Sequence, residues 1–241
     1  MWRVGPGRFY LADKTERAIM YRNSVSDIRS EFRRKKREQD FRGNGTIEIQ
    51  ACSFKADQPT IFGERNEKYV AAEIDWYESC DRRVEKLYEI YGKTVQIWDS
   101  VKDEHGCVNS QYGFRIYEQT HQYQSVLDEL ARYRKTRQAV MYYVPLEIHE
   151  IAGRDHICTT SVQYFLNNRI DRPPMLNAVV NMRSNDAIFG YANDFAWQHH
   201  VLVKLSADLC FRKDFDCVPG GIYWNAGSFH IYERHYGLIS N

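Results

Sequence analysis

The sequence lacks the features that would assign it to a membrane, a disulfide scaffold or a repeat array. No apolar run approaches the roughly 18 residues of a membrane span, and residues 1–6 lack the apolar stretch of a signal peptide. The six cysteines are scattered and include no Cys-x-x-Cys pair, so neither a zinc site nor a disulfide framework is predicted. We therefore expect a cytoplasmic protein with reduced thiols, no metal and no membrane contact.

An excess of charge of one sign is also missing. The chain has 33 Lys and Arg against 32 Asp and Glu, a net charge of +1, which argues against a dedicated nucleic-acid binder. Its 241 residues are 43% hydrophobic, enough for a sizeable core, and no linker-like stretch divides them. We expect one domain over residues 25–241, preceded by an extension over residues 1–24 in which Met20 is an alternative start.

Apolar spacing predicts a mixture of strands and helices. Residues 46–51 alternate as a half-buried strand does, with Ile47, Ile49 and Ala51 on one face. The other predicted strands are 139–144, 162–166, 177–182 and 222–232, and the predicted helices are 26–39, 67–79, one around 123–130, and 194–209. Because strands and helices do not alternate strictly, the pattern favours an α+β fold.

One carboxylate lies on an apolar helix stripe. Val70, Ile74 and Tyr77 define the stripe of helix 67–79, and Glu73 falls on it by its spacing. An unpaired carboxylate there is costly and its pKa should be raised by loss of solvent. Glu73 is therefore either a functional carboxyl or one side of a salt bridge to a neighbouring element.

Other candidate residues have two interpretations each when taken alone. Cys158, near a loop-to-strand junction, reads first as a small core residue, although a thiolate is a good nucleophile. Asp194 precedes a predicted helix, where it serves equally well as an N-cap or as a recognition residue. Arg183 follows a strand, where it forms a surface salt bridge or holds a phosphate and lowers the thiol pKa. His230 and Tyr232 share one strand face, as core aromatics would.

Several clusters occur in a specific order between residues 158 and 232. They are a lone cysteine, the Met-Arg-Ser-Asn-Asp run at 182–186, the Asn-Asp pair at 193–194 and the Gly-Ser-Phe-His-Ile-Tyr run at 227–232. Over about residues 26–236 the chain resembles the thymidylate synthase superfamily. Asp194 stands where thymidylate synthases carry an asparagine that reads uracil. An aspartate there, with Thr159 after the cysteine, resembles the bacteriophage deoxycytidylate hydroxymethylases.

The resemblance implies a fold, a dimer and a set of site residues. The fold is a mixed twisted sheet flanked by helices, and two chains pair sheet to sheet as a homodimer. Catalytic roles fall on Cys158, Glu73, Asp194 and Tyr112. Substrate binding falls on Arg42, Arg137, Gln163, Arg183, Ser184, Asp194, His230 and Tyr232. Folate contacts fall on Trp98 and Asp186. Arg137 would reach the phosphate of the partner subunit, and Gln138 replaces the second arginine of that clamp.

The implied reaction joins a cytosine nucleotide to a folate. Cys158 adds to C6 of dCMP, C5 attacks the methylene of 5,10-methylenetetrahydrofolate, and water positioned by Glu73 completes 5-hydroxymethyl-dCMP. Three alternatives stay open: the same reaction on CMP, thymidylate synthesis from dUMP, and a weakly catalytic nucleotide-binding or regulatory protein. Relatives continue beyond the position of Asn241, where thymidylate synthases close over the site. The basic residues 33–37 would suit docking of the regulatory alternative on a polymerase complex. The resemblance to phage enzymes also suggests a phage nucleotide-synthesis complex as a partner, in the host cytoplasm.

Overall fold

A five-stranded sheet organises the computed structural model, which describes residues 24–43, 45–145, 155–212 and 215–239. The strands run in the order β1-β5-β4-β3-β2. Their bounds are β1 Ile47–Lys55, β2 Val140–Tyr142, β3 Thr159–Arg169, β4 Arg172–Asp186 and β5 Val218–Ile231. β4 and β5 are parallel and the other pairs are antiparallel, so the sheet is mixed as expected. The predicted extension over residues 1–24 lies, apart from Ser24, outside the described residues.

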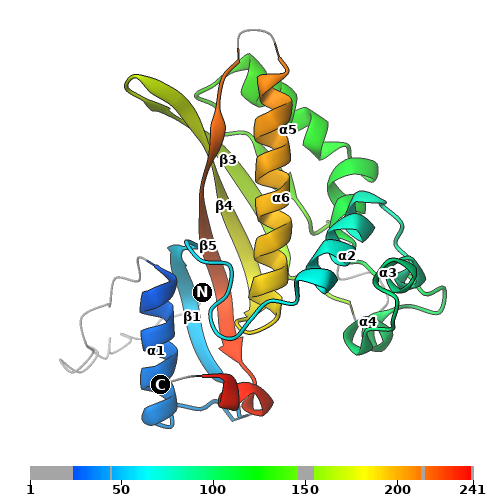
Figure 1. The fold of residues 1–241 in the computed structure, drawn as a ribbon, viewed down its shortest axis with the longest axis vertical. Coiled ribbons are helices and arrows are strands. Elements are labelled where there is room, and N and C mark those ends of the chain that lie inside the picture. Colours follow the sequence, from blue (N-terminus) through cyan, green and yellow to red (C-terminus); the bar gives the residue numbers. More distant parts are fainter. Residues whose placement is uncertain (1–23, 44, 146–154, 213–214, 240–241) are drawn as a thin grey trace, which may run out of the picture.

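Helices lie along the length of the sheet (Figure 1). They are α1 Val25–Arg37, α2 Glu67–Glu78, α3 Val84–Tyr91, α4 Gln96–Val101, α5 Gln122–Arg132 and α6 Gly190–Cys210, with a π-helical turn at Phe114–Glu118 and a 3-10 turn at Glu233–Leu238. α1 begins where the sequence provides a capping box, because Ser24 accepts from the Asp27 backbone and Asp27 accepts from the Ser24 backbone. α6 is the crossover that makes β4 and β5 parallel.

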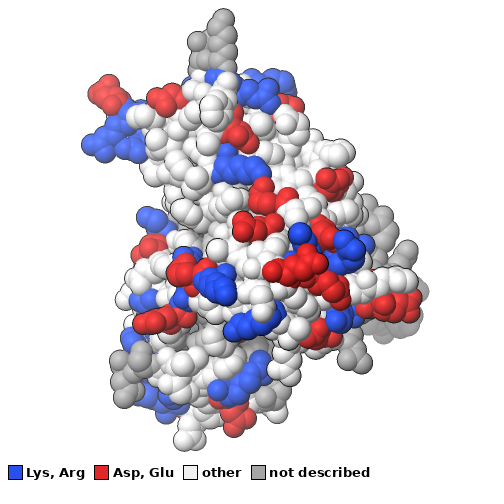
Figure 2. All heavy atoms as spheres, turned by 45° about the vertical axis from the view of Figure 1, so that its right-hand side comes forward, with Lys and Arg blue, Asp and Glu red and all other residues white. Residues whose placement is uncertain are grey.

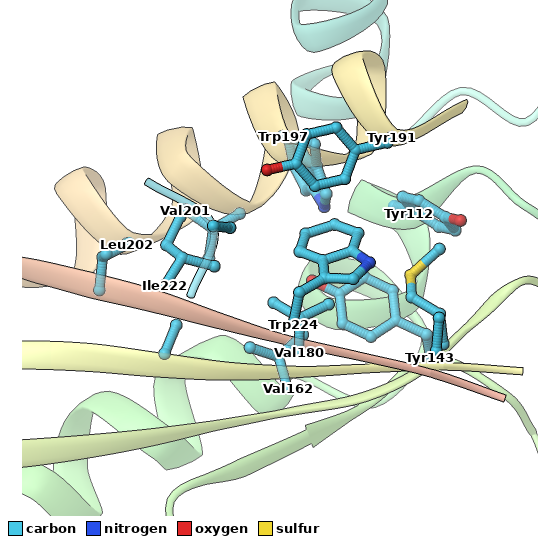
Figure 3. Packing of buried hydrophobic residues seen from close by; sticks show 14 of the residues in the cluster. Tyr112, Tyr143, Val162, Val180, Tyr191, Trp197, Val201, Leu202, Ile222 and Trp224 are labelled. Carbon is cyan, nitrogen blue, oxygen red and sulfur yellow. The ribbon is translucent and has the colours of Figure 1, made fainter. Parts of the chain in front are cut away.

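The helices cover one face of the sheet. Phe229 of β5 contacts Phe32 of α1, with ring centroids 5.7 Å apart, and Tyr191 of α6, at 5.9 Å, so both helices lie on the same side. Figure 3 shows the core between α6 and the sheet, aromatic toward the start of α6 and aliphatic further along it. Trp197 and Trp224 are fully buried there. The candidate site lies at the aromatic end of this core.

The opposite face of the sheet is open. Tyr142 and Tyr223 on this face are 62% and 44% exposed. A row of polar side chains crosses four strands in register. Ser53 Oγ donates to Asn225 Oδ1 at 2.6 Å, Asn225 Nδ2 donates to Asn181 Oδ1 at 3.1 Å, and Asn181 Nδ2 donates to Ser161 Oγ at 3.2 Å. The open face therefore carries a continuous row of hydrogen-bonded polar side chains across these four strands.

One detail of the predicted strand pattern is wrong. Ala51 does not share the buried face of Ile47 and Ile49, because it has a φ of +47° and is exposed. The pairs Gln50–Ser228 and Cys52–Ala226 keep one register, with one residue between them on each strand, Ala51 on β1 and Gly227 on β5. The alternation shifts by one residue at this left-handed position, so Cys52 and Phe54 become the buried residues.

Surface charge is mixed in sign. On the face drawn in Figure 2, basic and acidic side chains are interspersed and neither forms a continuous patch. Within the described residues, no helix is long and apolar enough to cross a membrane. The same part of the chain holds no group of three metal-ligating side chains.

Candidate active site

Glu73 is buried in α2, as its spacing predicts. It is 5% exposed, and Tyr69, one turn earlier, donates its hydroxyl to Glu73 Oε1 at 2.6 Å. Tyr69 in turn accepts from Trp98 Nε1 at 2.9 Å. Burial, together with the nearby Asp194 charge, raises the pKa of Glu73 to about 8 although the Tyr69 hydrogen bond opposes this. The hydroxyl of Tyr69 takes the place of the salt bridge considered above, and Glu73 holds a proton near neutral pH.

Cys158 lies directly before β3, beside Arg183 of β4. The two backbones are joined by Arg183 N donating to Cys158 O at 2.9 Å, and Arg183 Nη2 lies 3.7 Å from Sγ. The guanidinium also donates to the carbonyls of His156 and, at 2.9 Å, of Ile157. Burial and the Asp194 charge raise the pKa of Cys158 to about 11, while Arg183 lowers it. The predicted effect of Arg183 is present but is outweighed in the ligand-free chain.

Asp194 is not a helix cap, so that interpretation is wrong. α6 begins four residues before it, at Gly190. The capping carboxylate is that of Asp186, whose oxygens accept from the backbone of Ile188 at 3.1 Å and of Phe189 at 3.2 Å. Asp194 therefore lies within the second turn of α6, where its backbone needs no side-chain acceptor.

Asp194 is half-buried as a residue, and its carboxyl is held from β4. Asn185 Nδ2 donates to Asp194 Oδ2 at 2.8 Å. Burial raises the pKa of Asp194 to about 7, hydrogen bonds from Asn185 and Tyr112 lower it, and the charge of Asp186 adds to the rise. A carboxyl with this pKa exists in both protonation states near neutral pH.

Tyr112 lies close to Asp194 and Cys158, and both groups affect its pKa. Burial raises that pKa, followed by the charges of Asp194 and Cys158, so the phenol stays neutral. Its neighbour Gly113 allows the approach to α2, because a Cβ there would lie 1.7 Å from the carbonyl oxygen of Tyr77. The structure thus brings Cys158, Asp194 and Tyr112 together, as predicted from separate stretches.

His230 and Tyr232 form the other end of the site. Their rings pack edge to face with centroids 4.9 Å apart, and His230 Nδ1 lies 3.3 Å from Ser228 Oγ. Ser228 also donates to Glu48 of β1, which forms an ion pair with Arg42. Burial lowers the pKa of His230, against the charges of Asp186 and Glu48, so the imidazole is neutral near pH 7.

The remaining predicted residues lie in three places. Ser184 is paired in register with Ser228 at the His230 end. Trp98 of α4 is half-buried, packs edge to face on Trp76 and reaches Glu73 through Tyr69. Gln163 and Arg137 belong to the open face, where Gln163 Nε2 donates to the Arg137 carbonyl at 2.8 Å.

Three residues of this arrangement were not predicted. Tyr69 could have been predicted from the sequence, because it lies four residues before Glu73 on the same helix stripe. Asn185 stands in the 182–186 run, but its contact with Asp194 depends on the turn from β4 into α6. Glu48 contacts the site through the pairing of β1 with β5, where it faces His230. No local spacing indicates that pairing.

The fold and the clustered thiol, carboxyls and arginine agree with one protein family. A thymidylate synthase family profile matches residues 19–241, and the chain belongs to the thymidylate synthase family. Among solved structures, thermostable thymidylate synthase A from Bacillus subtilis is similar in fold, with a TM-score of 0.64 and 18% identity over 88% of this chain and 80% of that chain.

Proteins similar to this chain in sequence point to one branch of the family. The chain is 38% identical over 229 residues to the deoxycytidylate 5-hydroxymethyltransferases of Enterobacteria phages T4 and T6, covering 90% of this chain and 90% of each relative. It is 31% identical to the thymidylate synthase of Fusobacterium nucleatum, over 60% of this chain and 50% of that protein.

Proposed function

We propose that the protein is a deoxycytidylate 5-hydroxymethyltransferase, converting dCMP to 5-hydroxymethyl-dCMP with 5,10-methylenetetrahydrofolate as the one-carbon donor. The observation that carries the proposal is Asp194. This site carboxyl has a pKa of about 7, and its charge acts on the Cys158 thiol. The similarity to phage deoxycytidylate 5-hydroxymethyltransferases over 90% of both chains supports it.

Asp194 suits the edge of cytosine. Cytosine presents an acceptor at N3 and a donor at its N4 amino group. A carboxyl that shares one proton with this edge donates at N3 and accepts from N4. Uracil has the reverse pattern, a donor at N3 and an acceptor at O4, which leaves the carboxyl and the base mismatched.

Base binding also prepares the nucleophile. The Asp194 charge is one reason that the Cys158 pKa is raised, so a proton shared between Asp194 and cytosine removes that effect. Arg183, 3.7 Å from Sγ, then favours the thiolate. Addition of the thiolate to C6 places electron density on C5, and this carbon becomes able to bond to a one-carbon unit.

Glu73 provides the proton store that the last steps need. Near neutral pH its carboxyl is protonated, and the Tyr69 hydroxyl fixes Oε1. After this proton has passed to the departing folate amine, the Glu73 carboxylate accepts a proton from water as the water oxygen bonds to the one-carbon unit, while the thiolate leaves C6 and the C5–C6 double bond returns. The folate supplies the one-carbon unit, and the half-buried ring of Trp98 fits a flat pterin.

Arg42, Arg183, His230 and Tyr232 would hold the phosphate and sugar. Arg137 is exposed, and its carbonyl accepts from Gln163 of the open sheet face. A second copy packed against this face would place its own Arg137 near the first copy's nucleotide. The hydrogen-bonded row of Ser53, Asn225, Asn181 and Ser161 gives the face the regularity that a two-fold sheet interface needs.

The activity is tested by the mass of the product. Incubation with methylenetetrahydrofolate and an equimolar mixture of dCMP, CMP and dUMP is expected to add one CH2O to dCMP and none to dUMP, because Asp194 selects cytosine. Addition to CMP would change the substrate to a ribonucleotide. Return of all three nucleotides unchanged would remove the proposed activity.

The shared site is tested by complementation. Cys158→Ser and Arg137→Ala chains are each expected to be inactive, but a re-associated mixture should recover about one quarter of wild-type activity. About half of the dimers are then mixed, and each has one complete site of two. Equal mixing of Cys158→Ser with Cys158→Ser is the control. If Arg137 acts within its own chain, the mixture stays inactive.

A further inference from the structure

Asn185 is a buried polar residue that the reaction above does not use. It is 3% exposed near the end of β4, and its Nδ2 donates to Asp194 Oδ2 at 2.8 Å. Its own Oδ1 is buried and has no hydrogen-bond partner among the described residues. Burying an unpaired amide oxygen is unfavourable. The hydrogen bond from Nδ2 to Asp194 is the favourable polar contact of this side chain.

The turn from β4 into α6 leaves room for this contact. Gly190 is the first residue of α6, and a Cβ there would lie 3.2 Å from Asn185 Nδ2 and 3.9 Å from Asp194 Oδ2. Because glycine has no Cβ, the amide fits between the strand and the helix. Two residues nine apart in sequence thereby form one unit.

The amide also determines how Asp194 carries a proton. An N–H group only donates, so Asp194 Oδ2 must accept, and a proton on the carboxyl belongs on Oδ1. In this form the carboxyl offers one acceptor and one donor, which match N4 and N3 of cytosine. An amide turned the other way would draw the proton to Oδ2 and leave Oδ1 only as an acceptor.

We propose that Asn185 is a positioning residue that fixes which oxygen of Asp194 carries the proton, and so sets the preference for cytosine over uracil. This inference rests on the proposed function. The same bond opposes the effect of burial on the Asp194 pKa, which keeps both protonation states accessible. Asn185 acts through Asp194, because its buried amide cannot reach a nucleotide itself.

Several other titratable groups face Asp194 and contribute to its proton binding. They are Glu73 and Tyr77 of α2, Tyr112, Tyr143, Cys158 and Asp186. Asn185 differs from them because it is neutral at every pH. A change at Asn185 therefore alters the proton on Asp194 without adding a titration, unless an acid replaces it.

The test is equilibrium binding of dCMP and dUMP, without folate, across pH. Asn185→Ala is expected to lower the ratio of dCMP to dUMP affinity by about 10- to 100-fold on the acid side of the transition, where Asp194 is protonated but no longer oriented. The pH at which dCMP affinity falls should move upward, because loss of the N–H raises the Asp194 pKa. Asn185→Asp, which is nearly isosteric, should move this pH further upward. It replaces the alanine variant in the test if that variant does not fold.

Asn177→Ala is the matched control, since Asn177 is also buried in β4 but its Oδ1 accepts from the Gly221 backbone at 2.7 Å. It should lower the melting temperature and leave the ratio unchanged. If the Asn185 variants behave in the same way while the wild type prefers dCMP, the inference is overturned and the proposed function stands. If the wild type itself does not prefer dCMP, both are overturned.

Discussion

Cys158→Ser is expected to lower the turnover of dCMP by about four orders of magnitude or more while nucleotide affinity changes little. Serine keeps the size of the side chain but is a much weaker nucleophile toward C6. The measurement is kcat from product mass together with the Kd of dCMP. Retained turnover would remove Cys158 from the nucleophile role.

Cys80→Ser provides the matched control. Cys80 is also partly buried, and its pKa is likewise raised to about 11, chiefly by burial, but its Sγ contacts the Glu78 carbonyl instead of site residues. Its replacement should leave kcat unchanged. A similar loss in both variants would mean that serine disturbs the fold rather than the chemistry.

The raised pKa of Cys158 distinguishes the thiol of the ligand-free chain from the thiol beside a bound nucleotide. With a pKa of about 11, roughly one thiol in ten thousand is ionised at pH 7 in the ligand-free chain. Under the proposed function, reactivity then depends on nucleotide binding, which would neutralise Asp194. The thiol is therefore protected from general alkylation yet becomes a nucleophile beside its own substrate.

Periodicity predicted those parts of the site that depend on one element. The stripe Val70, Ile74 and Tyr77 correctly placed Glu73 inside, because a helix face is fixed by spacing alone. The order of β1 beside β5 was not predictable in this way. Glu48 and Ser228 are 180 residues apart, and only strand pairing brings them together.

The remaining error in the predicted site came from the position at which α6 begins. The predicted helix began at Asp194 because apolar residues follow it, but Tyr191 and Ala192 are also buried and extend the helix to Gly190. The cap then comes from Asp186, at the end of β4, a strand much longer than predicted. A four-residue difference in the helix start thus separated the capping role from the recognition role.

Asp194→Asn is expected to shift the ratio of dCMP to dUMP affinity by about 100-fold or more toward dUMP. The amide donates to O4 and accepts from N3–H of uracil, while it cannot share a proton with cytosine. The measurement is the Kd of both nucleotides without folate. Ser24→Ala is the control, because it weakens the cap of α1 and should lower the melting temperature with base preference unchanged.

Thermal stability separates the two interpretations of Asp194 independently of binding. Its folded-state pKa is raised, so the folded chain binds a proton that the unfolded chain has lost, and stability falls as pH rises from 3.8 to about 7. Asparagine removes this dependence, and the variant should melt higher relative to wild type above neutral pH than below it. Loss of a cap would instead lower the melting temperature. A carboxyl that destabilises the ionised fold and yet occupies the site is one whose proton serves the substrate.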